Sequence, residues 1–191
     1  VSNIAWKEYV ASLEESDRVK AFPDSKQWQA AFPNWKMQPM VEYYYQHPAY
    51  GNYPVVNVSK DQMQGYCNWL SGILNENLTN ENTPYKKVVV RLPTEEEWEF
   101  AARNGDENSD AEFPWEGNSL TIREKGKYQG LMRANFKRGR LDNMGIAGAL
   151  SDGADFTGPV EAYYPNELGL FNMSGNVAEM VSNGTVSYTH L

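Results

Sequence analysis

Residues 169–180 place the strongest constraint on how this chain folds. This stretch, Gly-Leu-Phe-Asn-Met-Ser-Gly-Asn-Val-Ala-Glu-Met, holds two glycines, two asparagines and a glutamate, with apolar residues between them. The pattern suits a rigid, buried loop that gathers oxygen atoms, since calcium takes about six to eight oxygens and glycine lets the backbone turn its carbonyls inward. Taken alone, however, the stretch favours a Gly/Asn turn followed by a short helix over a metal-binding loop.

Composition limits the classes of protein that the chain can represent. Its 191 residues suffice for one domain with a sizeable core. The net charge of −8 opposes a nucleic-acid partner, because phosphate backbones are repelled at long range. No apolar run approaches the roughly 20 residues that span a bilayer, so we expect no membrane span in this segment. Thirteen percent aromatic residues with fifteen Gly and ten Pro favour a loop-rich α+β domain.

Three helices are predicted from their starts and their apolar spacing. One begins at Ser2 or Asn3 and carries Trp6 and Tyr9 at helical intervals. Another follows the capping box Ser59-Lys60-Asp61-Gln62, with an apolar stripe from Met63 to Leu74. The third follows Thr94, whose box closes at Glu97, and it ends before Gly105. We assign no chemistry to its glutamates, which are typical of a solvated first turn.

The remaining segments are extended or irregular. Residues 87–92 are rich in β-branched side chains and predict a strand. Residues 21–53 and 106–157 lack periodicity and predict ordered irregular structure. Long loops of this kind need something to hold them, and Asp142, Asn143, Asp152 and Asp155 could supply oxygens to a metal.

Few residues could support catalysis. Cys67 is the only cysteine, so a pair of thiols within this chain is excluded, and it lies in an apolar stripe. Histidine occurs only at positions 47 and 190, which argues against an iron site with two histidines. We read His47 as a packed or hydrogen-bonded structural residue. We assign no catalytic residue and no cofactor-binding residue.

Several motifs occur in the order found in the formylglycine-generating enzyme, or sulfatase-modifying factor, family. The motifs are residues 53–59, 66–70, 91–103, 113–115, 134–136, 159–160 and 164–179. The chain therefore resembles this family over nearly its whole length. Asp24-Ser25 and residues 47–50 look most like members from Bacteroidetes, including lipoproteins of gliding motility and type IX secretion. By this resemblance, residues 1–186 form one family domain without its C-terminal part, and residues 187–191 are a possible non-family tail.

The resemblance implies a fold and two structural calcium sites. The fold is a loop-rich variant of the C-type-lectin-like fold, low in regular secondary structure. One calcium site carries over to Asn172, Gly175 (backbone), Val177 (backbone) and Glu179. The other carries over to Asn135, Phe136 (backbone), Asp152 and Ala154 (backbone).

The resemblance also implies an activity that depends on a cysteine pair, which this chain does not contain. Family members convert a sulfatase cysteine into formylglycine with oxygen, using two C-terminal cysteines that bind copper. Cys67 matches a structural helix position instead. We therefore expect a calcium-stabilised scaffold or binding module of the bacterial envelope, periplasmic or outer-membrane-associated, with a protein or peptide partner.

Two other functions stay open at this point. The chain could be the N-terminal part of a copper-dependent oxidoreductase whose cysteines lie beyond residue 191. A relative of the nonheme-iron ergothioneine type is the third option, which the scarcity of histidine disfavours.

Overall fold

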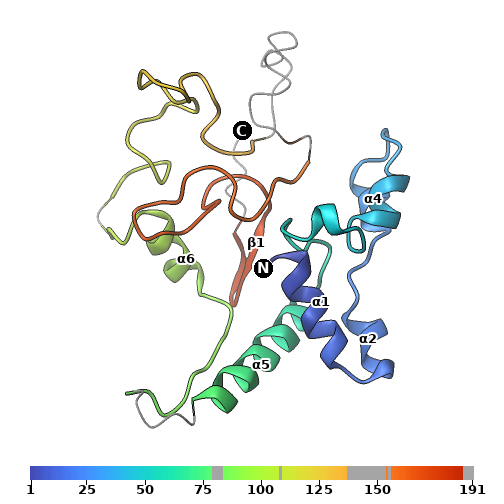
Figure 1. Cartoon of the computed structure of the whole chain (residues 1–191). Helices are drawn as coiled ribbons and strands as arrows, with labels where there is room; N and C mark the ends of the chain where they lie inside the picture. The colour runs from blue at the N-terminus through green and yellow to red at the C-terminus, as the bar shows by residue number, and fades with distance from the viewer. Residues whose placement is uncertain (79–83, 108, 137–153, 155, 187–191) are drawn as a thin grey trace. The chain divides into compact units, whose positions relative to one another are not determined.

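The computed structural model describes residues 1–78, 84–107, 109–136, 154 and 156–186 (Figure 1). The chain divides into two compact units, Val1–Leu92 and Pro93–Leu191, which are described separately. In the first unit the helices are α1 (Asn3–Ser12), α2 (Glu15–Ala21), α3 (Gln27–Ala31), α4 (Gln38–Tyr43), the 3-10 turn η1 (Pro48–Tyr50) and α5 (Lys60–Asn77). The second unit contains α6 (Glu95–Ala102) and an antiparallel hairpin of β1 (Glu179–Val181) and β2 (Gly184–Val186).

The three predicted helix starts are confirmed. Ser2 accepts a hydrogen bond from the amide of Ala5 at the start of α1. Ser59 and Thr94 each form a complete capping box, with Gln62 and Glu97 respectively. These caps satisfy amides that the first helical turn leaves without partners, which is why short polar side chains mark the boundaries so well.

Aromatic rings build the core of the first unit. Trp6 stacks on Tyr66 with ring centroids 5.4 Å apart, and Tyr9 meets both rings edge-on. The Trp6 indole donates to the carbonyl of Ala21 (3.1 Å), which ties the end of α2 to this cluster. Large rings therefore fill the space between α1, α2 and α5, as the aromatic content of the sequence indicates.

The prediction that residues 21–53 are irregular was wrong in part. Short helices α3 and α4 and the turn η1 lie within this segment. They are held by contacts distant in sequence: the buried Tyr44 donates its hydroxyl to the carbonyl of Pro54 (2.7 Å), and Asn3 donates to the carbonyls of Tyr44 and Tyr50. Tertiary contacts of this kind leave no local periodicity to read.

The strand predicted at residues 87–92 is also absent as a paired strand. Its backbone is instead bonded by two side chains of α5, Ser71 and Asn75. Asn75 both donates to and accepts from Val88, in the manner of a neighbouring strand.

A second, smaller core lies in the second unit. Trp98 of α6, Met173 and Val181 of β1 are buried together, with Ala101 and Ala102 packed against them. The amide of Ser182 donates to the carbonyl of Pro93 (2.8 Å), which fixes the hairpin beside the start of α6. None of the helices in the described part of the chain is both long and apolar enough to cross a membrane.

Candidate functional site: the 169–179 loop

The loop formed by residues 169–179 leads directly into β1, not into a helix. The reading of this stretch as a turn followed by a helix is therefore wrong, and residues 169–178 form an irregular loop. Four of its residues have positive φ: Gly169 (79°), Asn172 (54°), Gly175 (77°) and Asn176 (67°). Glycine and asparagine adopt this conformation most readily, so the residue types that mark the loop in the sequence are those that its backbone requires.

Gly175 is required for a close approach as well as for its φ. A Cβ atom at this position would collide with the backbone carbonyl of Asn135. The next amide, that of Asn176, donates to the same carbonyl at 2.8 Å. The loop is thus held against the segment of Asn135 by its backbone.

The side chain of Asn176 ties a third segment to these two. Its Oδ1 accepts from the amide of Gly158 (2.7 Å) and from Nδ2 of Asn135 (3.3 Å), and its Nδ2 donates to the carbonyl of Gly158 (3.2 Å). Asn135 also donates to the carbonyl of Phe156 (2.8 Å). Hydrogen bonds of Asn135 and Asn176 therefore join three segments, those around residues 135, 157 and 175.

In the side-chain amide of Asn172, the nitrogen has hydrogen-bond partners and the oxygen has none among the described residues. Its Nδ2 donates to the carbonyls of Val160 (2.8 Å) and Pro159 (3.3 Å), while its Oδ1 is buried without a hydrogen-bond partner among the described residues. Leaving a buried oxygen unpaired costs about 1–3 kcal/mol. A cation at this oxygen would remove that cost.

Glu179 is oriented by Trp98. The indole Nε1 of Trp98 donates to Oε2 of Glu179 at 2.6 Å. Trp98 is 7% exposed and is fixed in the small core by the capped helix α6. The carboxylate at the start of β1 is therefore held at one oxygen, and no hydrogen bond to its other oxygen occurs among the described residues.

The residues present fit a calcium ion in their chemistry. Calcium prefers oxygen donors of mixed kinds, and this loop offers the amide oxygen of Asn172, the carboxylate of Glu179 and the carbonyls of Gly175 and Val177. No group of three His, Cys, Asp or Glu side chains suited to a metal exists among the residues that the structure describes. The predicted set contains only one such residue, Glu179, so it depends on amide and backbone oxygens.

The other predicted calcium set is described only in part. Asn135 is buried. Ala154 lies near Gly158, because a Cβ added to Gly158 would be 3.8 Å from the Cβ of Ala154. The same added Cβ would be 3.9 Å from Oδ1 of Asn176. Phe136 lies with its ring edge-on to those of Phe113 and Trp115. Asp152, Asp142, Asn143 and Asp155 lie outside the described residues. Both ligand sets stay predictions.

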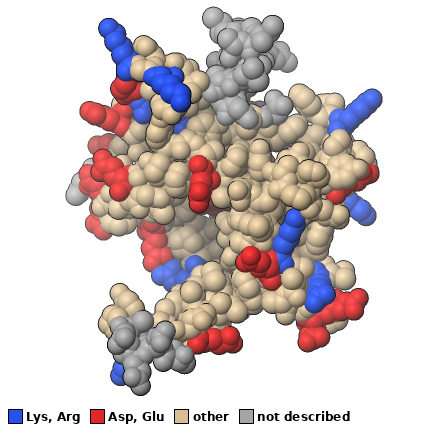
Figure 2. Space-filling view, in the orientation of Figure 1, with Lys and Arg blue, Asp and Glu red and all other residues tan. Residues whose placement is uncertain are grey.

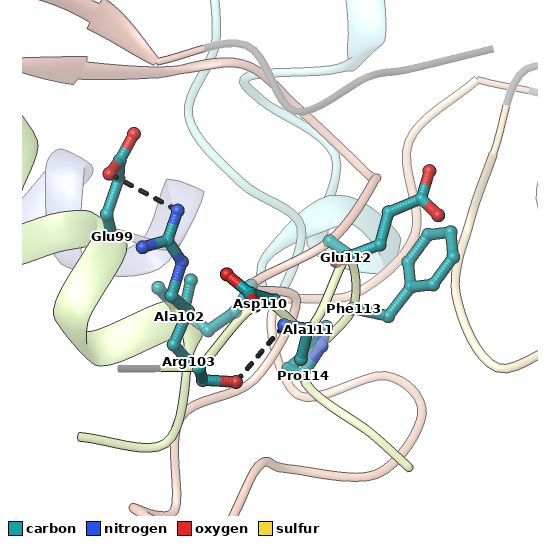
Figure 3. Close-up of a pocket in the computed structure, with 11 residues that line it drawn as sticks. Glu99, Ala102, Arg103, Asp110, Ala111, Glu112, Phe113 and Pro114 are labelled. Atoms are coloured by element: carbon teal, nitrogen blue, oxygen red, sulfur yellow. Dashed lines mark hydrogen bonds and ion pairs between the residues drawn. The ribbon is translucent and has the colours of Figure 1, made fainter. Parts of the chain in front are cut away.

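A cavity of about 430 Å³ lies beside this loop in the second unit (Figure 3). Met173 and Ser174 of the loop line it, with Glu99, Arg103 and residues 109–114. Arg103 approaches Glu99 with a distance of 3.6 Å between Nη2 and Oε2, as the dashed line shows. Asp110 and Glu112 add two further carboxylates, so the lining is acidic overall.

Comparison with known proteins identifies the family. The profile of the family described as "Sulfatase-modifying factor enzyme 1-like domain" matches residues 1–188. The chain belongs to this family.

Relatives of this sulfatase-modifying factor domain include proteins named as formylglycine-generating enzymes and proteins named as inactive. The chain is 35% identical over 132 residues to mouse formylglycine-generating enzyme (69% of this chain, 27% of that protein). The formylglycine-generating enzyme of Thermomonospora curvata is 37% identical over 128 residues (67% and 32%). A Bos taurus protein named "Inactive C-alpha-formylglycine-generating enzyme 2" is 33% identical over 132 residues (69% and 33%). The chain thus spans about a third of the length of these relatives.

The single thiol of this sulfatase-modifying factor domain is placed for packing. Cys67 is 6% exposed in α5, and burial raises the pKa of its thiol. Copper(I) binds thiolates, and a buried thiol with a raised pKa is a poor source of a thiolate.

Nδ1 of His47 accepts a hydrogen bond from the amide of Ala49 (3.2 Å) and caps η1. The prediction that His47 is a hydrogen-bonded structural residue is therefore confirmed.

Sequence reasoning missed two residues that hold this domain's loop, Asn176 within it and Trp98 in α6. Asn176, which joins three segments, was not among the predicted ligands, although the Gly-Asn pair at 175–176 is a signal for a special backbone. Trp98 was missed as the partner of Glu179, because the two are 81 positions apart.

Proposed function

We propose that this sulfatase-modifying factor domain acts as a calcium-stabilised scaffold or binding module. The observation that carries the proposal is the buried, unpartnered Oδ1 of Asn172 in the same loop as the oriented carboxylate of Glu179. A bound calcium would supply positive charge that holds the loop oxygens together. Asn172 and Glu179 would contribute side-chain oxygens, and Gly175 and Val177 backbone carbonyls. Asn135, Phe136, Asp152 and Ala154 are proposed for a second ion.

Calcium titration of two matched variants tests this proposal. Asn172→Gly removes the unpartnered oxygen at a position with φ of 54°, which glycine adopts without strain. Asn104→Gly is the control, because Asn104 has φ of 58° and makes two side-chain hydrogen bonds in the same unit, to Pro114 and Glu167. Calorimetry should show one calcium-binding event lost in the first variant and retained in the second. Equal stoichiometric binding by both variants would exclude Asn172 as a ligand.

A second candidate function is the N-terminal part of a copper-dependent formylglycine-generating oxidoreductase. It is favoured by the relatives named as formylglycine-generating enzymes and by the third of their length that the chain spans. Copper-binding cysteines would then lie beyond residue 191. A gene sequence extending past this residue with a cysteine pair supports the enzyme, and its absence supports the scaffold.

An activity assay separates the two functions for the chain itself. A peptide carrying a sulfatase cysteine would be incubated with the chain, copper and oxygen, and its mass followed. The scaffold proposal predicts unchanged peptide. Oxygen-dependent formylglycine formation by residues 1–191 alone would overturn it.

We propose further that the domain has the C-type-lectin-like architecture and belongs to the bacterial envelope. The irregular second unit with its short hairpin supports the first point. The likeness of residues 24–25 and 47–50 to Bacteroidetes gliding-motility and type IX secretion lipoproteins supports the second. Fractionation of source cells tests the location: recovery with periplasm or outer membrane agrees with it, and recovery with cytosol contradicts it.

A further inference from the structure

Among the described residues, the extended segment 87–92 of the first unit is hydrogen-bonded along one edge only. Ser71 Oγ accepts from the amide of Val90 (2.8 Å), and its own hydrogen is shared between the carbonyls of Cys67 (2.7 Å) and Val90 (3.3 Å). Asn75 accepts from the amide of Val88 (2.9 Å) and donates to its carbonyl (2.7 Å). These two residues are one turn apart on α5, so a helix supplies the bonds that a neighbouring strand would otherwise make.

The opposite edge of this segment presents backbone groups that have no hydrogen-bond partner in the part of the chain that the structure describes. In an extended chain the N–H and C=O groups of alternate residues point to opposite edges, so those of Lys87 and Val89 point away from α5. No hydrogen bond to either backbone occurs among the described residues. Val89 is 66% exposed, and Lys87 is exposed as well. Such an edge is a template for another strand.

The side chains along this edge indicate what kind of strand it accepts. Lys87, Val89 and Arg91 alternate with the half-buried Val88 and Val90, so they share the exposed face. Two cations therefore flank an apolar, β-branched residue, in a chain whose net charge is −8. Acidic and basic side chains are otherwise interspersed on the face shown in Figure 2. Cross-strand neighbours stabilise a pair when charges are opposite and apolar residues face each other.

We propose that this edge binds an extended, acidic segment of a partner protein by β-strand addition. The segment would place an acidic residue opposite Lys87 and a β-branched residue opposite Val89. This site shares no residue with the 169–179 loop and includes none of the proposed calcium ligands. It goes beyond the proposed calcium scaffold by naming the chemistry of a partner.

Hydrogen exchange at single amides tests the proposal directly. The probe is the synthetic peptide acetyl-Thr-Glu-Thr-Val-Thr-Glu-Thr-amide, added to residues 1–191 in the presence of a calcium chelator and again in calcium. Saturating peptide should slow exchange at the amides of Lys87 and Val89 by about tenfold or more. The amides of Val88 and Val90, already bonded to α5, serve as internal controls and should change little. Because calcium is varied independently, failure here is distinguishable from failure of the calcium proposal.

Two matched controls test the pairing and the charge. The same peptide with an N-methyl group on its central valine loses one backbone donor and should not protect Val89. Lys87→Glu should weaken binding about fivefold, while Lys36→Glu, an exposed cation elsewhere in the first unit, should leave binding unchanged. Slow exchange at Lys87 and Val89 without peptide would overturn the proposal, because the edge would already be covered. Protection that rises with protein concentration alone would overturn it in favour of pairing between copies.

Discussion

At the scale of single residues, Trp98 acts on the candidate calcium site through Glu179. Its indole bond of 2.6 Å fixes one carboxylate oxygen, and partners of this kind orient metal ligands. The Trp98→Phe variant keeps an aromatic ring beside Met173 and Val181 but removes the indole N–H together with part of the ring volume. We expect calcium affinity to fall about tenfold or more.

The measurement is calorimetric titration of calcium, with Trp6→Phe as the control. Trp6 also donates a buried indole bond, to Ala21, but in the first unit. Equal calcium affinity in Trp98→Phe and wild type would show that the indole bond does not serve the metal.

Gly175 carries a second prediction at this scale. Gly175→Ala introduces a Cβ that collides with the Asn135 carbonyl, and φ of 77° adds strain of about 1 kcal/mol. Gly169→Ala is matched, because Gly169 has φ of 79° with open space around its Cβ position. Chemical denaturation should show a larger loss of stability for Gly175→Ala. Equal losses would mean that the close approach to Asn135 is unimportant.

At the scale of the elements, the packing of α1 against α5 makes the stability of the fold depend on pH in the alkaline range. Burial raises the pKa values of Tyr9 and Tyr66, with a smaller contribution to Tyr9 from the charge of Asp17. The unfolded chain therefore loses these phenol protons first, near pH 10, and binds fewer protons than the folded chain above that pH. The free energy of unfolding should fall as pH rises above about 10.

Denaturant titrations between pH 8 and pH 11 check this prediction. Tyr66→Phe should reduce the dependence on pH, because it removes one of the raised phenols. Tyr43→Phe, at a position 52% exposed, should leave the dependence as in wild type. A stability that does not change with pH above 10 would contradict the role of the buried phenols.

The elements also show which parts of the fold could be predicted from sequence. The starts of α1, α5 and α6 were predicted because Ser2, Ser59 and Thr94 bond amides within three residues of themselves. Segment 87–92 has the composition of a strand but no strand as its partner among the described residues. Its partners, Ser71 and Asn75, could not be read from β-branched residues, because an α-helix supplies them.

At the scale of the whole molecule, the site was predictable to the extent that it depends on local backbone. Gly175 and Asn172 were predicted as ligands because the contiguous motif 169–179 resembles that of the family. Asn176 and Trp98 were not, because their roles depend on Asn135 and Glu179, which are 41 and 81 positions away. Only the folding of the second unit brings these residues together.

The central claim is that calcium stabilises this sulfatase-modifying factor domain through the 169–179 loop. A ligand that binds only the folded state at about a hundred times its Kd adds about 2.7 kcal/mol, or roughly 5–10 °C in Tm for a chain of this size. Thermal unfolding of wild type and Glu179→Ala, each in calcium and in chelator, is the most direct measurement. The account predicts a lower Tm for wild type in chelator, and no difference between the two conditions for Glu179→Ala. A well-folded wild type with the same Tm in calcium and in chelator would contradict it.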